Sequence, residues 1–301
     1  MGVLFLFLSV VFSMAKIIAM KKCGSVASGP KNSLKINVIR SSGCVLISLA
    51  VCAFGGFAGM NEIGAFCAVL SGVSTAFFLF SWVLATQKAS LSIVQVTCML
   101  FGVLLPMIAV PIACDGEFAG IVKWCGTLLL IPASLFFSKK ASGDKRTALS
   151  ALPILLLMGI SNGVCVTTRK IYMELGDGSA ADFNLITYTL AAAFLGLFLL
   201  ITVLKSRKSN TLPSQDTQSS EKPGIKLYVF IAIAMVTLYV ADYFNALASG
   251  KLAVEILVPL SYIFSMPMTL AADIIIFKEK FTLRSAIGLA LVIAAAVLTN
   301  I

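Results

Sequence analysis

Long, continuous apolar runs fill this chain, and they restrict its fold more than any other feature. Of the 301 residues, 59% are hydrophobic and 12% are charged, whereas a soluble domain carries about 25% charged residues. A helix needs roughly 20 apolar residues to cross a bilayer, and the strands of a membrane barrel would alternate in hydrophobicity. We therefore predict an all-α membrane protein whose surroundings are the lipid bilayer.

The apolar runs predict ten transmembrane helices, with nine as the alternative count because several runs are shorter than 20 residues or carry polar residues. The polar segment 205–226, rich in Ser, Thr, Gln and Pro, is expected to be a solvated loop. Lysines and arginines concentrate in the odd-numbered connections, which places those connections in the cytoplasm and both termini outside. The predicted helices cover residues 2–21, 34–54, 64–86, 91–113, 119–138, 151–172, 181–204, 226–248, 252–276 and 282–300.

The composition argues against several classes of function. The chain has no histidine, which removes the commonest general base and metal ligand. Its eight cysteines form no CxxC pair, and no GxSxG or phosphate-loop motif occurs. We therefore predict no metal, no cofactor and no enzymatic activity. The net charge of +10 arises from basic residues in the short loops between apolar runs, which is typical of membrane proteins. Nucleic acid is therefore not an expected partner.

Several features recur at a nearly constant spacing. Nine residues separate Glu117 from Gly126 and Glu279 from Gly288, and the second pair follows the first by 162 residues. "LATQK" and "LASGK" end 163 residues apart, and "PM" recurs 161 residues apart. The pattern predicts two halves of five helices, 1–138 and 151–301, joined by a linker at 139–150.

An odd number of helices per half has a topological consequence. The second half must enter the membrane in the opposite orientation, which gives an inverted repeat of the kind found in many secondary transporters. Such proteins bind substrate near the membrane midplane, between the halves. Because ten helices contain both halves, a monomer suffices, and a monomer or a homodimer is expected.

Two stretches also resemble a known family. "FKEKFTLRSAIGLALVIAAAVL" and "DGEFAGIVKWCGTLLLIPASL" each contain a Glu in a short turn before a final apolar helix. Together with residues 77–109, they resemble the drug/metabolite transporter superfamily, EamA-type. The resemblance implies a ten-helix permease for small metabolites or drugs, and we expect it in the bacterial cytoplasmic membrane. It also implies cytoplasmic termini, opposite to the orientation that the charges predict.

One carboxylate lies deep within a predicted span. Asp242 is well separated from the flanking lysines, with Tyr239 three residues before it and Asn245 three residues after it. Exposure of this polar stripe to lipid would be costly, so we expect it to face the bundle interior. Asp242 could bind a cationic substrate group or exchange protons. The structural alternative is an ion pair with one of three intramembrane bases, namely Lys16, Arg40 or Arg169.

Other residues complete the candidate site. The 163-residue offset places Leu79 opposite Asp242 and Trp82 opposite Asn245, so the halves are chemically unequal. Trp82 could stack on a substrate, and further candidate substrate contacts within spans are Asn162, Gln95 and Tyr262. Candidate coupling or gating residues are Asp242, Glu117, Glu279, Pro106 and Pro267, with helix capping as the alternative role for the two glutamates.

These features favour a secondary transporter that moves a small organic solute by alternating access. Asp242 would recognise the substrate or couple transport to protons. The alternatives are a non-transporting sensor or scaffold of the same fold and, less favoured, an integral membrane enzyme.

Overall fold

The part of the chain that the structure describes forms ten α-helices, in the order of the ten predicted apolar runs. The structure is a computed structural model, and it describes residues 1–26, 30–89, 91–116, 118, 120–137, 145–208, 225–276, 278 and 282–298. The helices are α1 (Gly2–Val26), α2 (Pro30–Gly55), α3 (Glu62–Lys88), α4 (Leu91–Ala113), α5 (Ile121–Phe137), α6 (Lys145–Leu175), α7 (Ala180–Lys208), α8 (Ile225–Ser249), α9 (Val254–Ile275) and α10 (Leu283–Leu298).

Helix lengths agree with a membrane protein. Seven helices, α1 to α4 and α6 to α8, are long and apolar enough to span a bilayer, and α5, α9 and α10 contribute shorter apolar stretches within the described residues. Several helices run further than predicted, including α6 and α7. Helix α6 begins at Lys145, inside the expected linker, and α7 continues to Lys208. Lysine and arginine are good helix formers, so a helix can continue past its apolar part into water.

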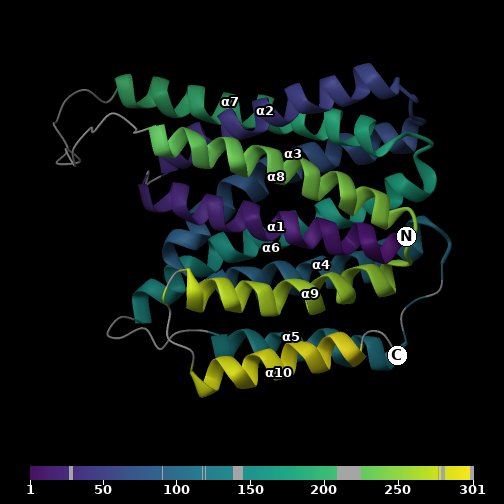
Figure 1. The fold of residues 1–301 in the computed structure, drawn as a ribbon, viewed down its shortest axis with the longest axis vertical. Coiled ribbons are helices and arrows are strands. Elements are labelled where there is room, and N and C mark those ends of the chain that lie inside the picture. The colour runs from purple at the N-terminus through teal and green to yellow at the C-terminus, as the bar shows by residue number, and fades with distance from the viewer. Residues whose placement is uncertain are drawn as a thin grey trace.

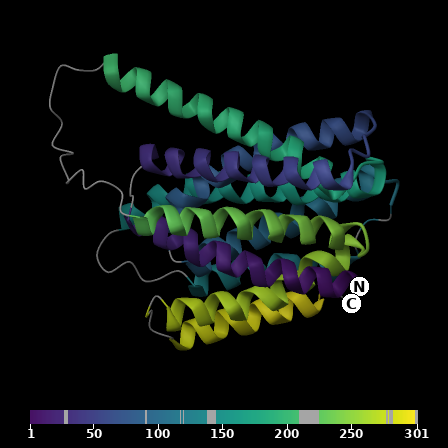
Figure 2. The ribbon, with the colours of Figure 1, turned by 45° about the horizontal axis from the view of Figure 1, so that its top comes forward.

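Consecutive helices run in opposite directions, and their connections alternate between the two ends of the bundle (Figure 1). Helix α10 ends at the same end of the bundle where α1 begins, as an even number of spans requires. Helices α5 and α10 pack against each other at one edge, and α2 packs against α7 near the opposite edge. Between these edges, α1 packs against α8, and α3 and α4 both pack against α6. The turned view in Figure 2 keeps this layering.

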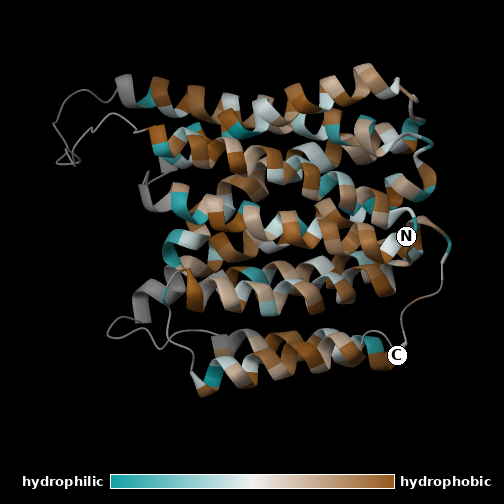
Figure 3. Cartoon of the chain, viewed as in Figure 1, coloured by the Kyte–Doolittle hydropathy of each residue, from teal (hydrophilic) through white to brown (hydrophobic). Residues whose placement is uncertain are grey.

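The outer surface of the bundle is apolar. Hydrophobic residues dominate the length of the helices, and hydrophilic ones are frequent near their ends (Figure 3). Large apolar side chains such as Leu46, Phe66 and Leu200 are exposed. Polar side chains such as Asn37 and Asp182 are instead fully buried. This distribution suits a protein surrounded by lipid, where apolar surface carries no penalty and polar groups must be satisfied inside the protein.

Polar contacts hold one end of the bundle together. The Asn61 side-chain amide donates a hydrogen bond to Asp177 at 2.9 Å, which links the α2–α3 connection to the α6–α7 turn. Asp182, in the first turn of α7, accepts hydrogen bonds from the Ala58 amide at 3.2 Å and the Ser179 hydroxyl at 2.8 Å. A carboxylate in this position also favours the helix dipole.

Two glycines bring α6 against α4. A Cβ added to Gly159 would lie 2.4 Å from a carbon of the Phe101 ring, and one added to Gly163 would lie 2.4 Å from the Phe101 backbone oxygen. Glycines four residues apart share a helix face and let two backbones approach closely. The ring can rotate, but the backbone oxygen belongs to α4 itself, so Gly163 fixes the distance between the two helices.

Gly163→Ala should therefore destabilise the protein, because the added methyl group cannot fit without moving α4. We expect a loss of about 1–3 kcal/mol and a lower Tm for the purified protein in detergent. Gly196→Ala is the matched control, since a Cβ at Gly196 meets nothing within 4 Å. Equal melting temperatures for the two variants would contradict the close approach at Gly163.

Candidate functional site

A cavity of about 160 Å³ lies inside the bundle. Seven helices line it, namely α1, α2, α3, α4, α6, α8 and α9, so both halves of the chain contribute. Five of the predicted substrate contacts are among its lining residues: Trp82, Gln95, Asn162, Asp242 and Asn245. Residues distant in sequence thus come together around one internal space.

Asp242 is held by groups from two other helices. One of its carboxylate oxygens lies 3.4 Å from Nη2 of Arg169 on α6. The Tyr188 hydroxyl, on α7, donates a hydrogen bond to the other oxygen. Arg169 also donates from Nη1 to the side-chain oxygen of Asn245 at 3.3 Å. The predicted polar stripe on α8 is therefore part of a network that joins α6, α7 and α8.

Two further bases line the cavity from the first half. Arg40, on α2, is 2% exposed. It donates from Nη2 to the Asn37 side-chain oxygen at 2.7 Å, and the Asn37 amide in turn donates to the Leu79 carbonyl at 2.8 Å. The Nε of Arg40 has no hydrogen-bond partner in the described part of the chain. Lys16, on α1, is half-buried and lies within electrostatic range of Arg40 and Asp242.

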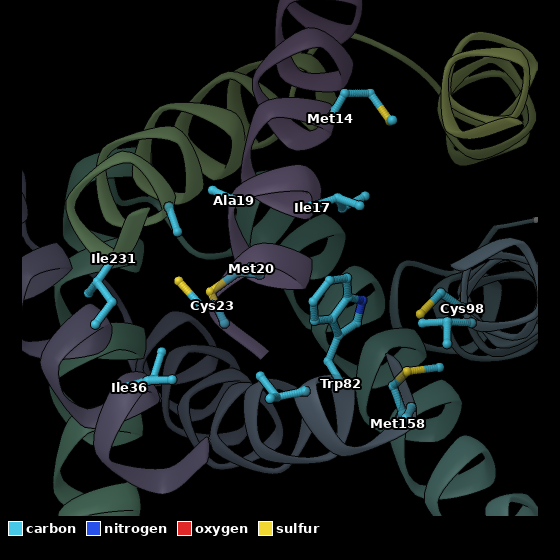
Figure 4. Packing of buried hydrophobic residues seen from close by; sticks show 14 of the residues in the cluster. Met14, Ile17, Ala19, Met20, Cys23, Ile36, Trp82, Cys98, Met158 and Ile231 are labelled. Carbon is cyan, nitrogen blue, oxygen red and sulfur yellow. The ribbon is translucent and has the colours of Figure 1, made fainter. Parts of the chain in front are cut away.

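An apolar wall faces these charges. Trp82 is 6% exposed and belongs to a buried cluster with Met20, Cys98 and Met158. Figure 4 shows its indole ring between Met20 of α1 and Cys98 of α4. Because Trp82 also lines the cavity, the ring packs the core on one side and is available to a ligand on the other.

Two amides add polar groups to the cavity. The Asn162 side-chain nitrogen donates to the Cys98 carbonyl at 2.9 Å, which ties α6 to α4 and fixes the orientation of this amide. Gln95 is half-buried and lines the cavity from α4. Together with Asn245 and the lining serines, these groups can orient a polar ligand.

Several predicted residues lie elsewhere. Tyr239 is 4% exposed and does not line the cavity. It packs in a buried cluster with Tyr188 and with Leu79, which does line the cavity. Positions three residues before and after Asp242 are separated by about 120° around the helix, so Asn245 faces the cavity while Tyr239 faces neighbouring helices.

Of the predicted coupling or gating residues, Asp242 lines the cavity and the two prolines do not. Pro106 is buried in α4 and Pro267 is exposed on α9, and both helices continue through their prolines. Glu117, Glu279 and the side chain of Tyr262 lie outside the described residues.

The sequence pointed to Lys16, Arg40 and Arg169 only as possible ion-pair partners of Asp242. The structure makes all three lining residues of the cavity, and Arg169 is the partner. Their positions within apolar runs could have indicated this role. A base within a membrane span costs free energy unless its side chain faces the protein interior.

Comparisons with known proteins bear on the fold. No family model and no curated protein matches the sequence. Among solved structures, 28 chains are similar. One of them, described only as a crystal structure of a protein, has a TM-score of 0.66 at 11% identity and covers 99% of this chain and 96% of its own. The ten-helix arrangement therefore also occurs in an experimentally solved protein.

Asp242→Asn should destabilise the protein, because it leaves the Arg169 guanidinium unpaired in the bundle. Removal of one partner from a buried pair costs roughly 3 kcal/mol. Asp242→Asn combined with Arg169→Gln should cost at least about 1 kcal/mol less than the sum of the two single changes. Thermal unfolding in detergent measures all three.

Glu174→Gln is the control for this comparison of the two single variants with the double variant. Glu174 pairs with Lys170 at 2.7 Å but is 36% exposed near the end of α6. Its loss should change stability by no more than about 0.5 kcal/mol. Strict additivity of Asp242→Asn and Arg169→Gln would mean that the two side chains do not interact.

Proposed function

We propose that the protein is a secondary transporter that moves a small organic solute across the membrane by alternating access. The observation that carries this proposal is the cavity, which places four charged side chains, Lys16, Arg40, Arg169 and Asp242, inside the apolar bundle. Charges within a membrane protein are costly and mark substrate or ion pathways. A fold that needed only stability could fill the same space with apolar side chains at no such cost.

The helix contacts support an inverted repeat. An inverted repeat makes each helix of the first half equivalent to the helix five positions later in the chain. Exchanging equivalent helices turns the contact of α1 with α8 into the contact of α6 with α3, and both contacts are present. In the same way α4–α6 becomes α9–α1, and α3–α7 becomes α8–α2. The pairs α2–α7, α4–α9 and α5–α10 are unchanged by the exchange. A pseudo-two-fold axis of this kind allows two related conformations in which the halves exchange roles.

The spacing of the sequence repeat gives a second line of support. Leu79 and Trp82 of α3 correspond to Asp242 and Asn245 of α8 at an offset of 163 residues. All four residues line the cavity. Corresponding positions in the two halves thus face the same space, as they would if the halves descended from one five-helix unit of the drug/metabolite transporter type.

We place the protein in a bacterial cytoplasmic membrane, as an integral component. The basic residues Lys21, Lys22, Lys31 and Lys35 lie at the end of α1 and the start of α2. By the positive-inside rule, this end of the bundle faces the cytoplasm. Protons are the proposed coupling ion, with Asp242 as their carrier, because a carboxylate is the natural carrier in a chain without histidine.

Solute flux in liposomes tests the transport proposal. Purified protein in liposomes should accelerate the exchange of at least one radiolabelled solute from a panel of organic acids, amines, amino acids, sugars and phosphate esters. Ser13→Trp should reduce that flux at least about tenfold, because Ser13 lines the cavity on α1 and the indole would occupy it.

Ala193→Trp is the matched control for this substitution. Ala193 is exposed on α7 and does not line the cavity, so the same side chain there should face lipid and leave the flux unchanged. If no solute in the panel moves faster than through protein-free liposomes, the transport proposal fails. The sensor or scaffold function would then be favoured.

A further inference from the structure

The charges that line the cavity do not balance. Among the described side chains, Lys16, Arg40 and Arg169 are basic, and Asp242 is the one carboxylate in the lining. Arginine keeps its proton in proteins, so the two guanidinium groups outnumber the carboxylate whatever the state of Lys16. An uncompensated positive charge inside a bundle surrounded by lipid is unfavourable. A bound anion would neutralise it.

Asp242 is already engaged within the protein. Arg169 and Tyr188 each contact a different oxygen of its carboxylate. A cationic substrate would have to compete with the Arg169 guanidinium for this group, and it would add to the positive charge of the cavity. The geometry thus disfavours the expectation that Asp242 receives a cationic substrate group.

Within the described residues, Lys16 and Arg40 are the lining bases that are not ion-paired, whereas Arg169, whose Nε also lacks a hydrogen-bond partner, is paired with Asp242. The described contacts of the Arg40 guanidinium comprise a hydrogen bond to the neutral Asn37 amide, and its Nε has no partner although the side chain is 2% exposed. Neither Lys16 nor Arg40 forms an ion pair with a described carboxylate. Lys16 lies within electrostatic range of one opposite charge, Asp242, and of two like charges, Arg40 and Arg169, which repel it. An anion between Lys16 and Arg40 would relieve this repulsion and supply the missing acceptor.

The remainder of the lining suits an organic body. Trp82, Phe78, Ile17 and Met20 provide apolar surface beside the two bases. A bare inorganic anion would make no use of this surface, whereas the hydrocarbon part of a carboxylic acid or a phosphate monoester would bury against it.

We propose that the solute is a small organic anion whose carboxylate or phosphate group binds between Lys16 and Arg40 while its apolar part packs on Trp82. This assignment rests on the proposed transport function, since it names the substrate class of that same cavity. Asp242 and Arg169 then form an internal ion pair of the site, and Asp242 is not the group that recognises the substrate.

Tryptophan fluorescence can read this site directly, because the chain contains only two tryptophans, Trp82 and Trp124. Trp124 lies on α5 beside a different cluster, so Trp124→Phe leaves Trp82 as the reporter. The probes are cyclohexanecarboxylate, cyclohexyl phosphate, cyclohexanecarboxamide and cyclohexylmethylammonium, which share an apolar body and differ in charge. We expect at least one of the two anions to bind about tenfold or more tightly than the amide and the ammonium.

The variants identify the binding group. Lys16→Gln and Arg40→Gln should each weaken anion binding about tenfold or more, the effect of one lost charge-assisted hydrogen bond. Arg40→Lys, which keeps the charge, should lose less affinity than Arg40→Gln. Lys35→Gln is the matched control, because Lys35 is exposed on the same helix as Arg40. Lys16→Gln, at a half-buried position, keeps the test decisive if Arg40→Gln fails to fold.

The binding experiment tests the anion assignment, and the flux experiment tests the proposed transport function. Preferred binding of the ammonium or the amide overturns the anion assignment, and so does anion affinity that is unchanged in Lys16→Gln. Absence of binding by all four probes also overturns it. In each case the flux experiment still decides transport by itself, since its panel includes amines, sugars and amino acids.

Discussion

The burial of charge away from water is the constraint on which the arrangement of this protein depends. Arg169 and Asp242 lie beside each other inside the bundle, and Tyr188 completes the carboxylate's contacts, so each charge offsets part of the cost of burying the other. Such a pair requires α6, α7 and α8 to keep a fixed relation, since the loss of either partner would leave a costly unpaired charge. The close contact at Gly163 also fixes the distance of α6 from α4.

The two halves of the chain contribute different kinds of side chain to the cavity, although the proposed repeat would give them the same fold. Corresponding positions on α3 and α8 carry Trp82 and Asn245, so one half supplies an apolar wall where the other supplies an amide. The first half contributes its own charges from other helices, with Lys16 on α1 and Arg40 on α2. The two halves of the chain thus surround an asymmetric site, which allows a ligand with one charged and one apolar end to bind in a single orientation.

Local patterns in the sequence predicted the helices and the direction of the polar stripe, because run length and helical periodicity are properties of short segments. These patterns correctly predicted that Asp242 and Asn245 face the interior of the bundle. They also assigned Tyr239 to the same face, although it lies about 120° from Asn245 around α8 and does not line the cavity. The choice of Arg169 as the partner of Asp242, over Lys16 and Arg40, depends on α6 lying beside α8. No spacing within a single helix contains that information.

A proton and an anion would favour each other in this site. Protonation of Asp242 removes the one negative charge in the described lining, and the cavity becomes more attractive to an anion held by Lys16 and Arg40. Linkage makes the effect reciprocal, so a bound anion would favour the protonated carboxylate to the same degree. The charges of one cavity would therefore serve both roles, with Lys16 and Arg40 binding an organic anion and Asp242 carrying the proton.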